Sequence, residues 1–454
     1  IGMALLPARK TVNLAPADIR KEGAFYDLPI LLGLLAAQGN IEEPLPEDSV
    51  FIGEISLRGE LRPIKGALSM AMAVQEAGKK KLFLPEANAE EAALIGDGLT
   101  IYAVRHVQQI LDHLTGKQLL EAYEPKDTED HTLEDVLDFC DVMGQENVKR
   151  AMEIAAAGGH NMLMSGSPGS GKSMMAKRIG TILPPTTLEE KMDVVRIYSI
   201  IGDGSRAARS QMRPVRAPHH TTSAAGIAGG GQGIPMPGEL SLAHNGVLFL
   251  DELPEFRIDA LEVLRQPLED GTVSIVRTAG RVTYPAKFML ICAMNPCKCG
   301  WYGHPSGRCK CTPAEVKKYR RKISGPLLDR IDIQVHVRPV PLKDLSERKP
   351  AESSADIRAR VVAARERQCA RYAGTKTRCN ADMLPAQLAE FCRPDAAGQA
   401  LLDAAFKKLG MTARSYDRIL RLARTIADLA GEEQISAGHI AEAIQYRSMD
   451  RDGA

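Results

Sequence analysis

A glycine-rich run at residues 161–173, NMLMSGSPGSGKS, has the residue types and spacing of a phosphate-binding loop. It lies between an apolar strand-like run and a helix-like run, and it fits the pattern G-x-x-x-x-G-K-[ST]. Backbone N–H groups of such a loop surround the phosphates, its lysine reaches the β and γ oxygens, and its serine holds Mg²⁺. We therefore expect nucleotide contacts from Gly166, Ser167, Pro168, Gly169, Ser170, Gly171, Lys172 and Ser173.

Two adjacent acids follow the apolar run GVLFL at residues 246–250. Phosphoryl transfer needs charge neutralisation and an aligned nucleophile more than covalent chemistry. We expect Asp251 to bind Mg²⁺ with Ser173, mostly through water, and Glu252 to polarise the attacking water. The alternative is an exposed acidic turn without chemistry.

Two further polar residues could complete an ATPase site. Asn295 ends a third apolar run and is placed to orient the lytic water or contact the γ-phosphate. Arg330 stands between Asp329 and Asp332, just before another apolar run, so its alternative role is an ordinary surface ion pair. An arginine that neutralises transition-state charge can come from a neighbouring subunit, and such a role for Arg330 requires an oligomer.

Four of the nine cysteines are packed into residues 297–311 as two C-x-C pairs. Two cysteine pairs separated by a short loop can enclose tetrahedral Zn²⁺ in a closed structural site, although C-x-x-C is the commoner spacing. We expect the ligands to be Cys297, Cys299, Cys309 and Cys311, with His304 in reserve. The dispersed cysteines are expected to be small buried hydrophobes: Cys140, Cys292, Cys369, Cys379 and Cys392.

The segment GTVSIVRTAGRVTYPAKF, residues 271–288, alternates apolar and polar residues around a turn, which predicts a β-hairpin. Arg277 and Arg281 lie at its tip and could bind a DNA phosphate backbone without sequence preference. The alternative is a solvated tip that makes only intersubunit contacts. A Gly-rich insert at residues 217–233 precedes it and contains His219 and His220; without an acid or cysteine at ligand spacing, it is expected to be a mobile substrate loop.

These residues need an α/β scaffold to position them. Residues 1–120 alternate short strand-like and helix-like runs and predict a domain of their own, and residues 121–136 are acidic and predict a linker. Residues 137–340 predict a doubly wound parallel sheet around the phosphate-binding loop. Residues 341–454 have helical periodicity and predict a helical lid.

The 454-residue chain has ordinary composition, with 44% hydrophobic and 25% charged residues, and a net charge of +1. That balance argues against binding nucleic acid with the whole surface, but it leaves room for a local basic lining. No apolar stretch approaches the length of a membrane span and no signal peptide is recognisable, so cytoplasmic localisation is expected. Because the first residue is Ile1, we expect the N-terminal domain to be incomplete.

The ordered set of phosphate loop, acid pair, Asn295, Arg330 and helical segment resembles the ring-forming AAA+ ATPases. That resemblance implies that Arg414 is the lid arginine that senses nucleotide, with Arg418 as the alternative. Longer strings are similar to the magnesium-chelatase-like ComM/YifB family of bacteria, over residues 1 to about 450: VRAPHHTTSAAGIAGGG, PGELSLAHNGVLFLDELPEF, LRQPLEDGTVSIVR, AMNPCKCG and ISGPLLDRIDI.

The resemblance implies an AAA+ P-loop NTPase core with a helical lid, which uses ATP and Mg²⁺ as a homo-hexameric ring. It further implies DNA-dependent ATPase activity on single-stranded or branched DNA, as a helicase or branch-migration motor in recombination or natural transformation. A rival reading is a chelatase-like chaperone that remodels a protein or loads metal into a macrocycle. The cysteine cluster and the N-terminal domain disfavour that rival, because chelatase ATPase subunits usually lack them.

Residues 20–39 and 53–91 resemble the proteolytic domain of Lon proteases. That family has its nucleophilic serine where this chain has Phe25, and its catalytic lysine where this chain has Leu68. Lys65 and Ser69 are close in sequence but would require the alignment to slip. Without an activated hydroxyl and amine no acyl-enzyme can form. We therefore predict a truncated, degenerate Lon-like domain that serves assembly or partner binding, and a third rival, an active protease, is disfavoured.

Overall fold

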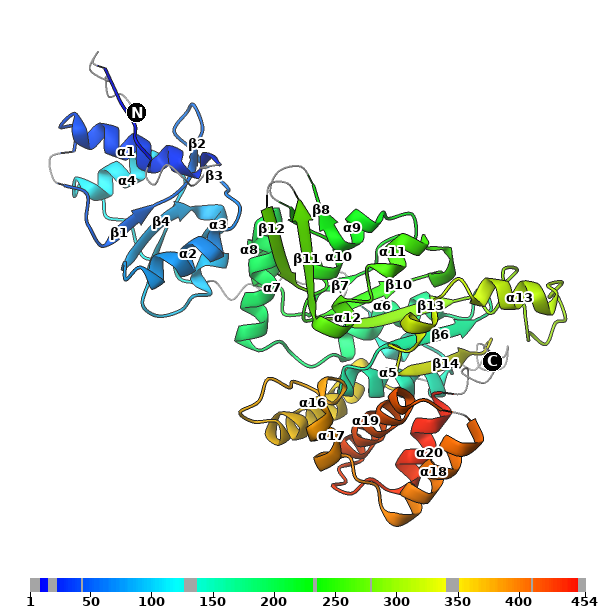
Figure 1. Ribbon diagram of the computed structural model, residues 1–454. Coiled ribbons are helices and arrows are strands. Elements are labelled where there is room, and N and C mark those ends of the chain that lie inside the picture. The colour runs from blue at the N-terminus through cyan, green and yellow to red at the C-terminus, as the bar shows by residue number, and fades with distance from the viewer. Residues whose placement is uncertain are drawn as a thin grey trace. The chain divides into compact units, whose positions relative to one another are not determined.

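The computed structural model contains two α/β units, each described here by itself (Figure 1). The first unit comprises Ile1–Asp130 and Thr187–Gln211, and the second comprises His131–Thr186 and Met212–Ala454. Residues 187–211, which the sequence assigned to the ATPase domain, therefore pack with the N-terminal unit. The structure describes residues 9–14, 23–41, 44–125, 137–231, 235–277, 280–339, 351–409 and 411–447. Most of the linker expected at residues 121–136 lies outside these ranges.

A three-stranded parallel sheet forms the centre of the N-terminal unit, with the order β1 (Ser49–Phe51), β4 (Lys81–Pro85), β5 (Thr100–Val104). Successive side chains of a strand point to opposite faces, so Phe83 faces one side and its neighbours Leu82 and Leu84 face the other. The ring of Phe83 stacks between Phe51 and Tyr102, with centroid distances of 4.7 and 4.6 Å. This aromatic row follows from the register, which pairs Phe51 with Phe83 and Phe83 with Tyr102.

Helices cover both faces of this sheet. The Phe83 face packs against α1 (Asp27–Ala37) and α4 (Val107–Leu114), and the Leu82 face packs against α2 (Ala67–Glu76) and α3 (Glu86–Ala93). The unit is completed by η1 (Ala24–Tyr26), by the hairpin of β2 (Glu54–Ile55) and β3 (Leu61–Arg62), and by α7 (Leu188–Ile201) and α8 (Gly204–Arg209).

The second unit is built on a five-stranded parallel sheet in the order β14-β6-β13-β10-β7. Its strands are β6 (Met162–Gly166), β7 (Val215–Arg216), β10 (Val247–Leu250), β13 (Met289–Met294) and β14 (Ile333–Val337). Every residue of β10 and β13 is buried, as expected for central strands of a parallel sheet covered on both faces. This sheet and the N-terminal one confirm the predicted α/β class.

Short elements connect these strands. They are η3 (Phe139–Asp141), α5 (Glu146–Gly158), α6 (Lys172–Ile182), α9 (Ala224–Ala228), β8 (Gly229–Gly230), β9 (Met236–Pro237), α10 (Glu239–Leu242), η4 (Leu253–Glu255), α11 (Ile258–Glu262), α12 (Pro267–Asp270), β11 (Thr272–Arg277), β12 (Gly280–Pro285), α13 (Pro313–Arg320) and α14 (Gly325–Leu328). Among them, α5 and α6 share the main hydrophobic core with β6 and β13.

The C-terminal segment is helical, as predicted, and appears yellow to red in Figure 1. It consists of α16 (Ser354–Arg371), η5 (Asn380–Asp382), α17 (Pro385–Phe391), α18 (Ala396–Leu409), α19 (Ala413–Ala430) and α20 (Ala437–Gln445). Helix α16 begins where Ser353 caps it, because the Ser353 hydroxyl accepts the Asp356 N–H at 3.2 Å. The domain boundary expected at residue 341 lies outside the described residues.

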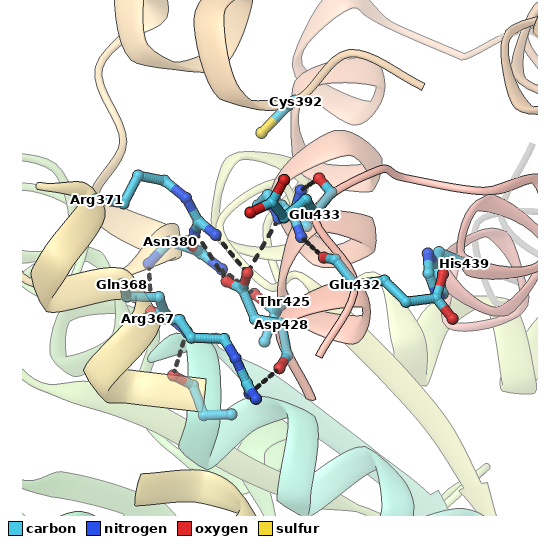
Figure 2. Close-up of polar contacts among 12 residues, drawn as sticks. Arg367, Gln368, Arg371, Asn380, Cys392, Thr425, Asp428, Glu432, Glu433 and His439 are labelled. Atoms are coloured by element: carbon cyan, nitrogen blue, oxygen red, sulfur yellow. Dashed lines mark hydrogen bonds and ion pairs between the residues drawn. The ribbon is translucent and has the colours of Figure 1, made fainter. Parts of the chain in front are cut away.

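A buried carboxylate holds these helices together (Figure 2). Asp428 of α19 is fully buried and accepts hydrogen bonds from Arg371 of α16 at 2.5 and 2.9 Å, from Asn380 at 2.8 Å and from Arg424 at 3.1 Å. Two arginines compensate the charge of Asp428, as a buried ion requires. Within the described residues, no helix is both long and apolar enough for a membrane span.

Candidate nucleotide site

The phosphate-binding loop joins the carboxyl end of β6 to the amino end of α6. Gly169 and Gly171 have φ values of 76° and 93°, which glycine adopts without steric cost. Gly171 is the N-cap of α6, so the loop directs the first free N–H groups of that helix outward. A helix N-terminus of this kind favours a phosphate group.

The side chain of Lys172 folds back over this loop. Its Nζ donates to the carbonyl oxygens of Gly166 at 2.7 Å and Ser167 at 3.0 Å, and to Oδ1 of Asn295 at 3.2 Å. Burial lowers the pKa of Lys172, while the negative charges of Asp251 and Glu252 act in the opposite direction. The amine therefore lies between the loop, the acid pair and Asn295.

The two residues expected to hold Mg²⁺ touch each other. Ser173 Oγ donates to Oδ2 of Asp251 at 2.5 Å. A hydroxyl and a carboxylate are oxygen ligands of the kind that Mg²⁺ prefers, and one or two protein ligands suffice for an ion that retains several waters. The pair therefore fits a Mg²⁺ ion held together with the phosphates of a nucleotide.

Glu252 is held in an uncommon backbone conformation and faces a residue that the sequence did not connect to it. Its φ is 52°, in the left-handed region, and its N–H donates to Oδ1 of Asp251 at 2.9 Å. Its Oε2 lies 3.3 Å from Nδ1 of His220, whose ring stacks on that of His219 with centroids 4.0 Å apart. The histidine pair of the Gly-rich insert thus adjoins the acid pair, and no metal-ligand spacing could have indicated this contact.

The strand order explains why Asn295 reaches the same place. Strand β13 lies between β6 and β10, and all three run in parallel. The carboxyl ends of parallel strands meet at one edge of a sheet, which is the usual place for ligands in open α/β sheets. Lys172, Ser173, Asp251, Glu252 and Asn295 are therefore brought together at that edge.

Arg330 is not part of this group within the chain. Strands β6 and β14 pair from Met162 with Ile333 to Gly166 with Val337, and Arg330 precedes β14. Its carbonyl accepts from Nδ2 of Asn161 at 2.8 Å, so it lies at the amino edge of the sheet, opposite the phosphate loop. Its guanidinium donates to the Pro326 carbonyl at 2.7 Å and pairs with Glu269 of α12.

The two candidate lid arginines differ in their contacts. Arg418 lies 3.7 Å from Oδ1 of Asp332 and donates to the Ile331 carbonyl at 3.3 Å, which places it at the amino edge near Arg330. Arg414, one turn earlier on α19, is exposed and has no ion pair or hydrogen bond with any described residue. Neither arginine contacts the phosphate loop of its own chain.

The four cysteines of residues 297–311 converge on one point. Their Sγ atoms all lie within 4.8 Å of one another, and the separations from Cys297 are 3.3 Å to Cys299 and 3.8 Å to Cys309. Zn–S bonds of about 2.3 Å in a tetrahedron separate the sulfurs by about 3.8 Å, so the cluster fits Zn²⁺. A hydrogen bond from the Trp301 backbone lowers the pKa of the Cys299 thiol to about 6, which favours the thiolate that zinc requires.

The cysteine loop adjoins the nucleotide loop. Gly300 has a φ of 84°, and a Cβ added there would lie 2.7 Å from the ring of Pro168. His304, the reserve ligand, instead contacts the Ser306 hydroxyl at 2.7 Å and is not part of the cluster. Among the dispersed cysteines, the prediction of burial is confirmed for Cys292, Cys379 and Cys392 but wrong for the exposed Cys369 and the half-buried Cys140.

The predicted hairpin is present as β11 and β12. Arg277 pairs with Gly280 and Val276 with Arg281, and both arginines are exposed; Thr278 and Ala279 of the tip lie outside the described residues. Its buried face rests on the Gly-rich insert, where the Tyr284 hydroxyl donates to the Pro235 carbonyl at 2.6 Å. The hairpin therefore presents two unneutralised positive charges on an anchored support.

Comparisons with known families account for most of the chain. Residues 138–345 match the family described as magnesium chelatase, subunit ChlI, and residues 351–447 match its C-terminal part. Residues 1–88 match a further family described as subunit ChlI of Mg-chelatase.

Individual relatives extend this likeness. The protein YifB of Escherichia coli is 42% identical over 449 residues, which cover 98% of this chain and 86% of that protein. The competence protein ComM of Haemophilus influenzae is 40% identical over 456 residues, covering 98% of this chain and 87% of that protein. Lon protease 2 of Bacillus subtilis is 30% identical over 113 residues, 25% of this chain and 20% of that protein, so the Lon-like similarity is confined to one region. The chain therefore belongs to the magnesium-chelatase-like AAA+ family of ComM and YifB.

Proposed function

We propose that this chain is one subunit of a cytoplasmic ATP-driven ring that moves on DNA. Membership of the AAA+ family implies ATP hydrolysis with Mg²⁺, and members of this family typically form oligomers. The observation that carries the proposal is the separation of charges across the sheet. Lys172 and the acid pair converge at the carboxyl edge, while Arg330 and Arg418 lie at the amino edge.

Each residue of the carboxyl edge has a role that its contacts support. Lys172 would leave its carbonyl partners for the β and γ phosphate oxygens, while Ser173 and Asp251 would hold Mg²⁺. Glu252 would orient and polarise the attacking water, and Asn295 would position that water or the γ-phosphate.

The amino edge supports a ring. Transition-state charge on the transferred phosphoryl group is often neutralised by an arginine supplied by another subunit. Arg330 has no contact with the phosphate loop of its own chain in the described residues, and the lid arginine Arg414 is unpaired there. In a closed head-to-tail ring, the amino edge of one subunit would complete the carboxyl edge of the next.

The hairpin of β11 and β12 is the proposed DNA contact. Arg277 and Arg281 are exposed and could bind backbone phosphates of single-stranded or branched DNA without reading sequence. The printed name of the Haemophilus influenzae relative, competence protein, is consistent with DNA as the substrate and with a helicase or branch-migration role in recombination or natural transformation.

Steady-state ATP hydrolysis with and without single-stranded and branched DNA tests this function. We expect DNA to stimulate hydrolysis, and we expect Arg277→Ala/Arg281→Ala to weaken DNA binding and reduce its salt dependence by up to about two phosphate contacts. Arg257→Ala/Arg393→Ala removes the same charge from exposed positions outside the hairpin and serves as the control. If no DNA stimulates the wild-type protein, the DNA motor is excluded.

The family description also favours a second candidate, a chelatase-like chaperone that remodels a protein or a metal-insertion partner. It predicts hydrolysis that responds to a protein partner and ignores DNA, so the same assay separates the two. We do not expect protease activity, because Phe25 and Leu68 occupy the positions of the Lon dyad.

A further inference from the structure

The N-terminal unit has a buried apolar contact that its own sheet does not explain. Helix α2 buries Ala67 and Ala71 against the sheet, whereas Leu68 belongs to a separate cluster with Val195 of α7 and Ala208 of α8. Leu68 is fully buried there, and Val195 is fully buried as well. Helix α2 therefore has one face for its own domain and a second face for the helical pair inserted from the ATPase sequence.

Close backbone approaches reinforce this contact. The Gly66 N–H donates to the Ser199 carbonyl at 3.0 Å, and the Ser205 hydroxyl donates to the Ala87 carbonyl at 2.5 Å. A Cβ added at Gly204 would lie 2.0 Å from Oε2 of Glu91, so only glycine fits at that position. Glu91 itself is only 2% exposed, which shows how completely α8 covers α3.

The other end of this helical pair is fixed in the ATPase unit. Helix α6 ends at Ile182 because Leu183 takes an extended backbone before Pro184, as residues before proline do. The guanidinium of Arg213, just after the pair, donates to the carbonyls of Pro184 at 2.8 Å and Pro185 at 3.0 Å. It also donates to the Asn245 carbonyl at 2.7 Å, one residue before the Gly246 that leads into β10. Both ends of the pair are thus tied to each other and to the approach to Asp251.

We propose that α7 and α8 form an arm that docks on the Leu68 surface and transmits the nucleotide state of the ATPase unit to the N-terminal domain. The docking surface is defined as Leu68, Met72, Leu94 and the Glu91 carboxylate. In the Lon-like domain, the position that matches the catalytic lysine is thereby an attachment point for a helical hairpin of the same chain. The transmission step rests on the proposed nucleotide site, whereas the docking step does not.

The chain connectivity supports transmission. The helix that begins with Lys172 ends at Ile182, and the arm begins at Leu188. A movement of α6 or β10 on nucleotide binding would therefore reach the arm through the Arg213 contacts, without passing through the linker near residue 130.

Hydrogen exchange on the full chain tests docking. Leu68→Lys buries a charge against Val195 and Ala208, and Leu57→Lys makes the same change at a fully exposed position of the same unit. We expect amides of α7 and α8 to exchange about tenfold faster or more in Leu68→Lys, and to be unchanged in Leu57→Lys. Equal exchange in the two variants would overturn the docking surface. If Leu68→Lys unfolds β4 and β5, Gly204→Ala replaces it, because one methyl group displaces α8 from Glu91 and leaves the sheet untouched.

Adding Mg²⁺ and a non-hydrolysable ATP analogue tests transmission. In the wild type and Leu57→Lys, we expect the analogue to change exchange in the arm and in β4 and β5. In the variant with a released arm, the change in β4 and β5 should disappear while the analogue still binds. An undiminished change there would overturn transmission through the arm. If the wild type does not bind the analogue, the proposed ATP site fails, and the nucleotide-free comparison still decides docking.

Discussion

The two units share a layout and differ in what their key positions carry. Each has a parallel sheet with helices on both faces, but the carboxyl edge of the ATPase sheet gathers Lys172, Asp251 and Asn295. In the N-terminal unit, the positions that resemblance to Lon proteases marks for chemistry hold Phe25 and Leu68, and Leu68 is buried under another element. The comparison shows that a layered α/β scaffold keeps its form while a few side chains decide whether it catalyses or docks.

This contrast predicts that changes in the ATPase unit alter turnover and that changes in the N-terminal unit alter stability and attachment. A variant of the N-terminal unit that abolished hydrolysis outright, or an acid-pair variant that left it intact, would break the comparison.

The largest effect is expected for Glu252→Gln. The amide keeps the size of the side chain but cannot polarise water, so kcat should fall about 100- to 1,000-fold while ATP binding persists. Phosphate release and equilibrium nucleotide binding measure the two properties. Glu255→Gln, three residues later on an exposed side chain, should leave both unchanged. Loss of nucleotide binding in Glu252→Gln would mean that this carboxylate is structural.

Metal content should show an intermediate effect that is confined to the ATPase unit. We expect about one zinc per chain in the purified protein, and Cys299→Ser should lose it because a closed site needs all four ligands. Cys369→Ser removes an exposed cysteine outside the cluster and should retain the metal. Elemental analysis decides, and less than about half an equivalent in the wild type would contradict a structural site.

The smallest effect is expected for Glu91→Gln in the N-terminal unit. Burial raises the pKa of Glu91, so the folded state prefers the neutral carboxyl. The associated stability is present below the unfolded pKa and is lost as pH rises through the raised folded pKa. Denaturation between about pH 4 and about pH 8 should show the variant gaining stability over the wild type with rising pH, by about 1 kcal/mol per unit of pKa difference. The exposed Glu76→Gln should follow the wild type, and a parallel pH dependence in Glu91→Gln would refute the assignment.

The sequence predicted what is local and periodic. The strand, loop and helix around Lys172 follow from contiguous residues, and the α/β class and helical C-terminus follow from hydrophobic spacing. Contacts between distant segments could not be predicted in this way. Neither the approach of His220 to Glu252 nor the packing of Val195 on Leu68 leaves a periodic signal, because each depends on how separate elements are placed in three dimensions.

The strand register also supplied what spacing along the chain could not. Arg330 follows Asn295 by a short stretch and therefore looked like a neighbour of the same site. Pairing of β14 with β6 shows that it lies at the other end of the strands.

The left-handed backbone of Glu252 sets evolution two conflicting tasks. A side chain at a φ of 52° costs a residue other than glycine, asparagine or aspartate on the order of 1 kcal/mol, a cost that glycine would avoid. A laboratory screen that rewards only heat resistance would therefore tend to replace Glu252, and the survivors would be sturdy proteins that no longer turn over ATP. Thermostabilised forms of this chain should consequently be selected for turnover at the same time.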